Sequence, residues 1–276
     1  MSSPGPPLPL SFSRLNLFAA CPLRYRYLEV ERRPEPGVAP DWRHAPARTE
    51  AFGVASSFDR SFGVAVHGAL ARWQRAIDGG GSRKSTGLVV AVATAARDAG
   101  LDPAATERGL ARLKPGLDWY ASGPWPRRGT VFLEQRVSHV LAAPDGFAVE
   151  LHLRVDRVAR FNRGVAIIDF KTVTPHRLEL TGDRWQLHTY ALAAPELIGV
   201  PAERVHLALI DLQAGAEIRV ESTAVGLRRT ADELLDSARR VAAGDFGVGG
   251  HPDRPCWSCG FRLDCPSSLA PEVVHG

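Results

Sequence analysis

Two patterns of apolar residues divide the chain, a helical one in its first half and an alternating one in its second half. The clearest alternation lies within residues 146–161, where every second position from 149 to 155 is apolar. Side chains of a β-strand point alternately to its two faces, so this segment is expected to be a strand with one buried face. The apolar set is Val149, Leu151, Leu153 and Val155, and the polar set is Glu150, His152, Arg154 and Asp156.

Four further segments read as strands. Residues 165–171 form a continuous apolar run that ends in Asp-Phe-Lys, which indicates burial at the centre of a sheet. The sequence Asn-Arg-Gly at 162–164 predicts a hairpin turn between this strand and the preceding one. The remaining strands are predicted at residues 131–142, 204–212 and 217–223.

Helical spacing is clearest at residues 58–77, where Val66, Leu70, Trp73 and Ile77 form an apolar stripe. A short helix is expected to begin at Ser11 or Ser13, which can cap it, and to end near Cys21. Residues 87–121 predict helix in two pieces, and Pro115 is expected to kink or split the second. Two more helices are predicted at residues 183–194 and 225–243.

These elements predict an α/β fold with a central mixed β-sheet flanked by helices. Residues 1–9 are a Pro-rich segment expected to be a flexible tail, and residues 33–57 are rich in Pro, Gly and Ala and expected to be a loop. The predicted organisation is one domain over residues 10–266, followed by a tail over 267–276. Within it we expect a helical part at about 10–125, a sheet core at about 126–225, and a C-terminal helix with a cysteine segment at about 226–266.

Composition limits the class of protein. The chain has 276 residues, 45% of them hydrophobic and 23% charged, which is typical of a globular domain. No apolar run is long enough to span a bilayer, and the first residues lack a signal-like core, so we expect a cytoplasmic protein without a membrane partner. A net charge of +4 is compatible with a polyanionic partner without requiring one.

The four cysteines are Cys21, Cys256, Cys259 and Cys265, and the last three have the spacing C-x2-C-x5-C. Structural disulfides are disfavoured in a reducing compartment. The chain has no cysteine outside this set, which suggests that the four thiolates bind a single metal centre. An iron–sulfur cluster and a zinc ion both accept four thiolates, and a pair of disulfides or a set of free thiols is also compatible with the spacing.

Candidate chemistry lies at the end of the buried strand, in Asp169-Phe170-Lys171. The 34 basic residues include only three lysines, so a lysine at this point suggests a task that needs a compact ammonium. With Asp156 on the neighbouring strand, two carboxylates and an ammonium can meet, and carboxylates are hard ligands suited to Mg²⁺ or Mn²⁺. The alternative interpretation is a salt-bridged pair on a solvated sheet face.

The order of these motifs resembles the RecB-type branch of the PD-(D/E)xK nuclease superfamily over nearly the whole chain. Each motif is short, but the ordered set is specific, and Leu153 departs from the glycine usual in its motif. The matching segments are Leu10 to Leu15 with Cys21 to Tyr27, Val66-His67-Gly68, Glu134 within Phe132 to Gln135, Leu153-Arg154-Val155-Asp156-Arg157-Val158, Ile168-Asp169-Phe170-Lys171-Thr172 and Gln186-Leu187-His188-Thr189-Tyr190-Ala191.

The resemblance implies a restriction-endonuclease-like core and a role for each matching residue. Asp156, Asp169 and His67 would ligate a Mg²⁺ or Mn²⁺ ion, with the Phe170 carbonyl as a further ligand. Lys171 would handle the attacking water, and Gln186 and Tyr190 would position the lysine, the phosphate or the strand. Glu134 is either catalytic or a supporting residue behind the ligands. Cys21, Cys256, Cys259 and Cys265 would hold a [4Fe–4S] cluster, with zinc as the alternative.

The implied function is metal-dependent cleavage of DNA, as an exonuclease on single strands or DNA ends in repair or recombination. Two different functions remain open: a non-catalytic iron–sulfur DNA-binding subunit of a helicase complex, and a CRISPR-associated nuclease that trims DNA. DNA is the implied partner and a helicase a second one. The sequence leaves the oligomeric state open.

Overall fold

The computed structural model describes residues 6–33, 57–162, 164–172, 181–247, 256 and 259–267. Most of the loop expected at 33–57 and most of the tail expected at 267–276 lie outside these residues. The contacts of the chain group it into two compact units. The first comprises Met1–Val54, Ser138–His152 and Ala231–Gly276, and the second comprises Ala55–Val137 and Leu153–Thr230.

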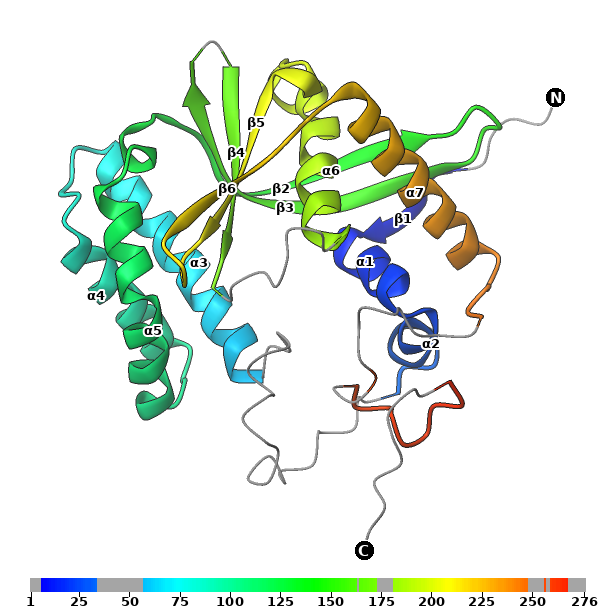
Figure 1. Cartoon of the computed structure of the whole chain (residues 1–276), viewed down its shortest axis with the longest axis horizontal. Helices are drawn as coiled ribbons and strands as arrows, with labels where there is room; N and C mark the ends of the chain where they lie inside the picture. The colour runs from blue at the N-terminus through cyan, green and yellow to red at the C-terminus, as the bar shows by residue number, and fades with distance from the viewer. Residues whose placement is uncertain are drawn as a thin grey trace, which may run out of the picture. The chain divides into compact units, whose positions relative to one another are not determined.

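A mixed sheet is built from the described strands in the order β1-β3-β4-β5-β6, with β2 paired to β3 (Figure 1). The β3–β4 and β5–β6 pairs are antiparallel, whereas β1–β3 and β4–β5 are parallel. The prediction of a mixed α/β sheet is confirmed. The strands are β1 Leu8–Ser11, β2 Thr130–Ala142, β3 Ala148–Phe161, β4 Gly164–Lys171, β5 Val205–Asp211 and β6 Ala216–Val220.

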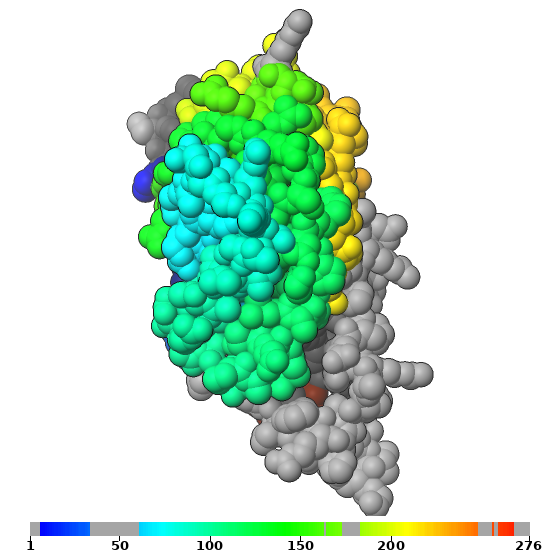
Figure 2. Space-filling model, turned by 90° about the vertical axis from the view of Figure 1, so that its left-hand side faces the viewer, coloured from blue at the N-terminus to red at the C-terminus, as the bar shows by residue number. Residues whose placement is uncertain are grey.

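Helices α3, α4 and α5 lie to one side of β4 and β5, and α6 lies to the other (Figure 1). Apolar residues of α3, α4 and α5 pack with Ala166, Ile168 and Phe170 of β4 in one continuous core. Figure 2 shows the surface that α4 and α5 present outward, in cyan and green. The helices of this unit are α3 Ser57–Asp78, α4 Ser85–Asp98, α5 Pro103–Ser122 and α6 Thr181–Ile198, with short turns η4 Trp125–Arg127 and η5 Ala202–Arg204.

In the other unit, the N-terminal segment packs with the C-terminal one. Ser11 caps α1 by accepting a hydrogen bond from the Arg14 amide, as predicted. The rings of Tyr27 and Phe261 lie 5.0 Å apart, and Phe261 is buried. The elements that lie wholly or partly in this unit include α1 Phe12–Ala20, α2 Pro22–Tyr25, η1 Arg26–Val30 and α7 Ala224–Ala242, which starts in the other unit.

Three details differ from the sequence-based expectation. Leu8 and Pro9, placed in the flexible tail, belong to β1, which pairs in parallel with Val149–His152 of β3. Helix α5 runs unbroken through Pro115, and α6 runs through Pro195 to Ile198. Both prolines are exposed, so water can satisfy the carbonyl that each proline leaves without a helical donor.

No helix in the described part of the chain is both long and apolar enough to cross a membrane.

Candidate active site

The site forms where β3 and β4 part. Their antiparallel ladder begins at Phe161 and Gly164 and reaches Arg157 and Ile168. Just beyond it, the backbone amide of Phe170, two residues past Ile168, donates a hydrogen bond of 2.9 Å to Oδ2 of Asp156, the residue next to Arg157. A side-chain carboxylate therefore takes the place of a ladder partner, and polar groups gather around the point of divergence.

Three potential metal ligands meet beside this point. The ligand atoms of His67 on α3, Glu134 on β2 and Asp156 on β3 all lie within 4.8 Å of one another. His67 Nδ1 is 3.0 Å from Asp156 Oδ1. Asp156 thus uses one oxygen for the β4 backbone and the other for the imidazole.

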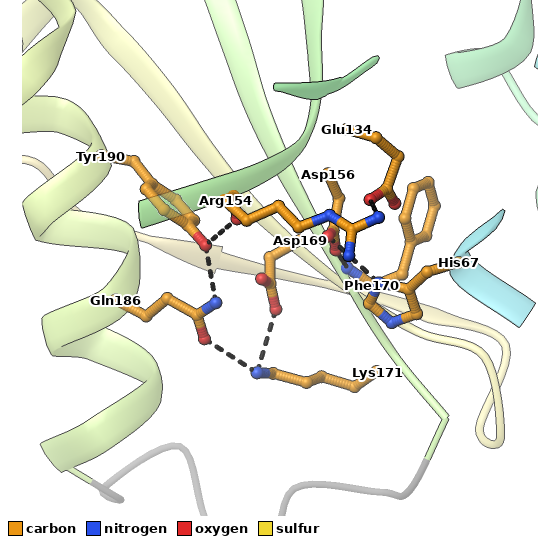
Figure 3. A network of polar contacts seen from close by, with 9 residues as sticks. All are labelled: His67, Glu134, Arg154, Asp156, Asp169, Phe170, Lys171, Gln186 and Tyr190. Carbon is orange, nitrogen blue, oxygen red and sulfur yellow. Dashed lines mark hydrogen bonds and ion pairs between the residues drawn. The ribbon is translucent and has the colours of Figure 1, made fainter. Parts of the chain in front are cut away.

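Glu134 reaches this group through an unusual backbone conformation. Its φ of 52° lies in the left-handed region, which is costly for a residue with a Cβ atom. The regular alternation of buried and exposed residues along β2 begins only after it, at Val137. The Arg154 guanidinium pairs with the Glu134 carboxylate (Figure 3), and the arginine side chain is 55% exposed whereas that of Glu134 is 10% exposed.

A second cluster surrounds the ammonium of Lys171 at the end of β4 (Figure 3). Lys171 Nζ lies 3.0 Å from Asp169 Oδ2, 2.9 Å from Asp183 Oδ1 and 3.1 Å from Gln186 Oε1. Asp169 is 2% exposed, so the ammonium is the group that compensates a fully buried carboxylate.

Hydrogen bonds link Lys171 to β3, the strand that carries Asp156. Gln186 Nε2 donates to the Tyr190 hydroxyl at 2.7 Å, and that hydroxyl donates to the backbone carbonyl of Arg154 at 2.6 Å. Gln186 and Tyr190 are four residues apart on α6 and therefore share a face. The chain from Lys171 to Arg154 fixes the lysine relative to β3.

Burial and charge oppose each other at His67. Burial alone would lower the pKa of its imidazole, but the carboxylates of Asp156, Asp169 and Glu134 outweigh burial and raise the pKa to about 9. The ring is therefore protonated at neutral pH before any cation binds, and it donates to Asp156.

Burial and the neighbouring opposite charges also act in opposite directions on the pKa of Asp169 and on that of Lys171. Burial raises the pKa of Asp169 to about 6, with Lys171 acting against it and Asp156 adding to it. Burial would lower the pKa of Lys171, but Asp169 and Asp183 raise it above its ordinary value, so the amine stays an ammonium. Burial also raises the pKa of Tyr190 well above its ordinary value, which keeps its hydroxyl a donor.

The structure brings the sequence-predicted residues of the sheet and α6 into one neighbourhood. Asp169 lies outside the group of three close ligand atoms because its carboxylate turns to Lys171. Its role as a ligand and that of the Phe170 carbonyl stay predictions. The Phe170 ring faces the core, 5.2 Å from the ring of Tyr120.

Two residues of the site were missed by the sequence reasoning, and spacing could have indicated both. Asp183 precedes Gln186 by three residues and Tyr190 by seven, so all three lie on one face of α6. Arg154 precedes Asp156 by two residues on β3 and therefore points to the same side of the strand.

The chemistry of the donors suits a hard divalent cation. Two carboxylates and one imidazole converge, and Asp169 adds a third carboxylate close by. Oxygen-rich sites of this kind favour Mg²⁺ or Mn²⁺ over softer metals. The residues therefore fit such an ion at His67, Glu134 and Asp156.

The four cysteines lie in the other unit, and none forms a disulfide. Cys21 caps α2, and its sulfur accepts from the Arg24 amide at 3.4 Å. Contacts of the cysteine segment with the N-terminal helices include Arg33 Nη2 to Asp264 Oδ2 at 3.4 Å. Among the described residues, the cysteine sulfurs form no group of three within 4.8 Å of one another. The predicted shielding residue Trp257 is outside the described residues.

A family model for the PD-(D/E)XK nuclease superfamily matches residues 9–266. Among solved structures, one titled "Crystal structure of SSO0001" is similar, with 15% sequence identity and a TM-score of 0.44. The similarity covers 96% of this chain and 89% of that one. The comparison with curated proteins found no match.

Proposed function

Because this chain belongs to the PD-(D/E)XK nuclease superfamily, we propose that it is a Mg²⁺- or Mn²⁺-dependent deoxyribonuclease. The observation that carries the proposal is the meeting of His67, Glu134 and Asp156 beside a buried Asp169–Lys171 pair. A structural salt bridge would not need three further ligand atoms within 4.8 Å of one another.

His67, Glu134 and Asp156 would hold the divalent ion, with Asp169 completing the set. The bound ion would supply Lewis-acid polarisation of a phosphate oxygen and would lower the pKa of a bound water. Asp156 can ligate through Oδ1 while its other oxygen keeps the Phe170 amide. Its position is thus fixed before any ion arrives, which limits the reorganisation that binding requires.

Lys171 would act as a fixed positive charge. Two carboxylates keep it protonated, so in this arrangement it donates hydrogen bonds to the attacking water or to the charged phosphate oxygens rather than accepting a proton. Gln186 and Tyr190 hold its Nζ in place through the chain that ends at the Arg154 carbonyl. Asp183 would keep the ammonium in position when Asp169 turns to the ion.

We further propose a RecB-like exonuclease that acts on single strands or DNA ends in repair or recombination, in the cytoplasm. The support is the ordered set of motifs from Cys21 to Tyr190. The cysteines are proposed to hold a [4Fe–4S] cluster, with zinc as the alternative. The packing of Phe261 on Tyr27 supports this proposal, because it brings the C-terminal cysteine segment to the N-terminal helices that carry Cys21.

The decisive experiment measures degradation of single-stranded, blunt and circular DNA by purified protein with Mg²⁺ or Mn²⁺. Lys171→Ala is expected to abolish cleavage, whereas Lys114→Ala, which removes an exposed lysine from α5, is expected to leave it unchanged. Degradation of linear but not circular strands would support the exonuclease mode. Cleavage by Lys171→Ala at the wild-type rate would refute the proposed mechanism, and DNA binding without cleavage would favour a non-catalytic subunit.

The metal of the cysteine centre has its own test. Protein purified without oxygen is expected to be brown, with a broad absorption band in the visible blue and about four iron atoms per chain by metal analysis. Cys265→Ser is expected to bleach that band. Colourless protein with one zinc per chain would show that the centre is a zinc site instead.

A further inference from the structure

A basic hollow lies at the end of α5, apart from the residues of the candidate active site. The turn after α5 and its neighbours enclose an open hollow of about 470 Å³. Arg127 and Arg128 supply its charged lining, and both side chains are exposed. The lining consists of Ser122, Gly123, Pro124, Arg127 and Arg128. We call the whole segment 122–128 the arginine turn.

The buried guanidinium of Arg157 fixes the backbone of the arginine turn through hydrogen bonds. Arg157 on β3 is 0% exposed. One end of its guanidinium donates to the Tyr120 hydroxyl at 2.9 Å and to the Trp125 carbonyl at 3.0 Å. The other end donates to the Arg128 carbonyl at 2.7 Å. Two carbonyls of the turn are therefore fixed by one planar group.

Other buried groups fix the turn further. Gln74 on α3 is 1% exposed, and its Nε2 donates to the Pro126 carbonyl at 3.2 Å. The Trp125 indole donates to Glu217 Oε2 at 2.9 Å. Since its carbonyls are already bonded, the backbone presents Arg127 and Arg128 from a rigid base, and little ordering is left for a ligand to induce.

The charge of the hollow is not balanced locally. Among the described residues, neither Arg127 nor Arg128 has a carboxylate partner. The acid that contacts the base of the turn, Glu217, is bonded to Trp125 and lies 3.0 Å from His206 Nε2. Arg157 donates only to neutral oxygens, so its buried charge adds to the positive potential.

A third arginine extends the basic surface. Arg160 follows on β3, is exposed, and donates from its backbone amide to the Gly129 carbonyl at 2.8 Å. Its side chain lies beside Gly129, directly after the arginine turn. Guanidinium groups bind phosphate oxygens in pairs of parallel hydrogen bonds, so a row of rigidly mounted arginines without carboxylate partners suits a chain of phosphates.

We propose that the arginine turn is a second nucleic-acid subsite, which binds backbone phosphates of the substrate strand away from the cleaved bond. The inference rests on the proposed nuclease function. Helix α3 carries both His67 of the metal group and Gln74 beneath the turn, and seven residues of helix span about 10 Å. A strand cleaved at the metal group can therefore reach the turn within a few nucleotides.

The test compares long and short substrates in the double variant Arg127→Ala/Arg128→Ala. The matched control, Arg83→Ala/Arg108→Ala, removes two exposed arginines of the same unit that do not line the hollow. Binding of a fluorescent single strand of about 16 nucleotides is measured by anisotropy without divalent ions, over a series of salt concentrations. Cleavage of the same strand and of a dinucleotide is measured in parallel with Mn²⁺.

We expect the double variant to bind the strand at least about tenfold more weakly, with a salt slope lower by about 1.4, which corresponds to two phosphate contacts. Dinucleotide cleavage should match the wild type, because a dinucleotide does not extend to the turn. The control should behave as wild type in both assays, and Arg127→Lys/Arg128→Lys should restore the salt slope.

Unchanged strand binding by the double variant, while the wild-type protein cleaves the dinucleotide, would overturn the subsite and leave the nuclease proposal intact. An equal loss in the control would also overturn it, since the effect would then be one of net charge. A wild-type protein that cleaves neither substrate would overturn the proposed function and the subsite with it.

Discussion

Binding of the divalent ion should release a proton from His67. The surrounding carboxylates raise the pKa of this imidazole to about 9, so about 99% of the molecules carry the proton at pH 7. A metal ligand must be the neutral imidazole, and the proton must therefore leave when the ion binds. The apparent affinity for the ion should rise about tenfold per pH unit between pH 7 and pH 8 and level off above the pKa.

The size of the effect follows from the distance between the pKa and the working pH. Two pH units below a pKa of about 9, the competing proton weakens ion binding about a hundredfold, or about 2.7 kcal/mol. Asp169, whose pKa is about 6, should add a second released proton only as the pH falls through that value. Ion affinity is therefore expected to fall on acidification and to fall more steeply below about pH 6.

Isothermal titration calorimetry can count the protons. Mg²⁺ is the suitable ion because it avoids thiolates, and titration in two buffers with different ionisation enthalpies gives the number released. We expect about one proton per ion at pH 7 in the wild type and close to none in His67→Gln, whose amide oxygen can ligate but does not titrate. Release of no proton by the wild type, or the same release by His67→Gln, would refute the assignment of His67 as a ligand.

Two further predictions concern the lysine cluster and the packing of α5. Asp183→Asn removes one of the two carboxylates that hold Lys171, so it should lower kcat about tenfold and leave Mg²⁺ affinity within a factor of about two. Loss of ion binding instead would show that Asp183 is a ligand. Gly116→Ala should lower the free energy of unfolding by at least about 2 kcal/mol in chemical denaturation, because the added Cβ would overlap the Leu212 carbonyl oxygen. Gly87→Ala, where the added methyl has its nearest contact at 3.7 Å, should be neutral or stabilising, and equal effects of the two substitutions would contradict this account.

The sheet and helices were predictable because their patterns are long. Alternation along residues 149–155 and the apolar run of 165–168 fixed β3 and β4 to within about two residues. β1 was missed because four residues that include Pro9 carry too little pattern to distinguish a strand from a Pro-rich tail. Its pairing with β3 is a tertiary contact that has no local signature.

The site was predictable where chemistry and spacing coincide. Asp156, Asp169 and Lys171 follow from strand periodicity, and the structure places Asp169 and Lys171 in contact. The orientation of Asp169 toward Lys171 rather than toward His67 could not be predicted, because it depends on which cation is near a buried carboxylate. The left-handed backbone of Glu134 was equally hidden, since nothing in its neighbours demands that conformation.

Asp156 accepts a hydrogen bond from the Phe170 amide at the place where β3 and β4 separate. This hydrogen bond determines which substitution of Asp156 is suitable for an inactive variant. Replacement by alanine would remove the acceptor from a buried backbone N–H, so loss of activity could reflect damage to the sheet. Asparagine keeps an oxygen for that N–H, while it removes the negative charge and places an amide NH₂ where Oδ1 faces His67. Asp156→Asn is therefore the variant with which trapped substrate complexes are best sought, because its sheet should remain that of the wild type.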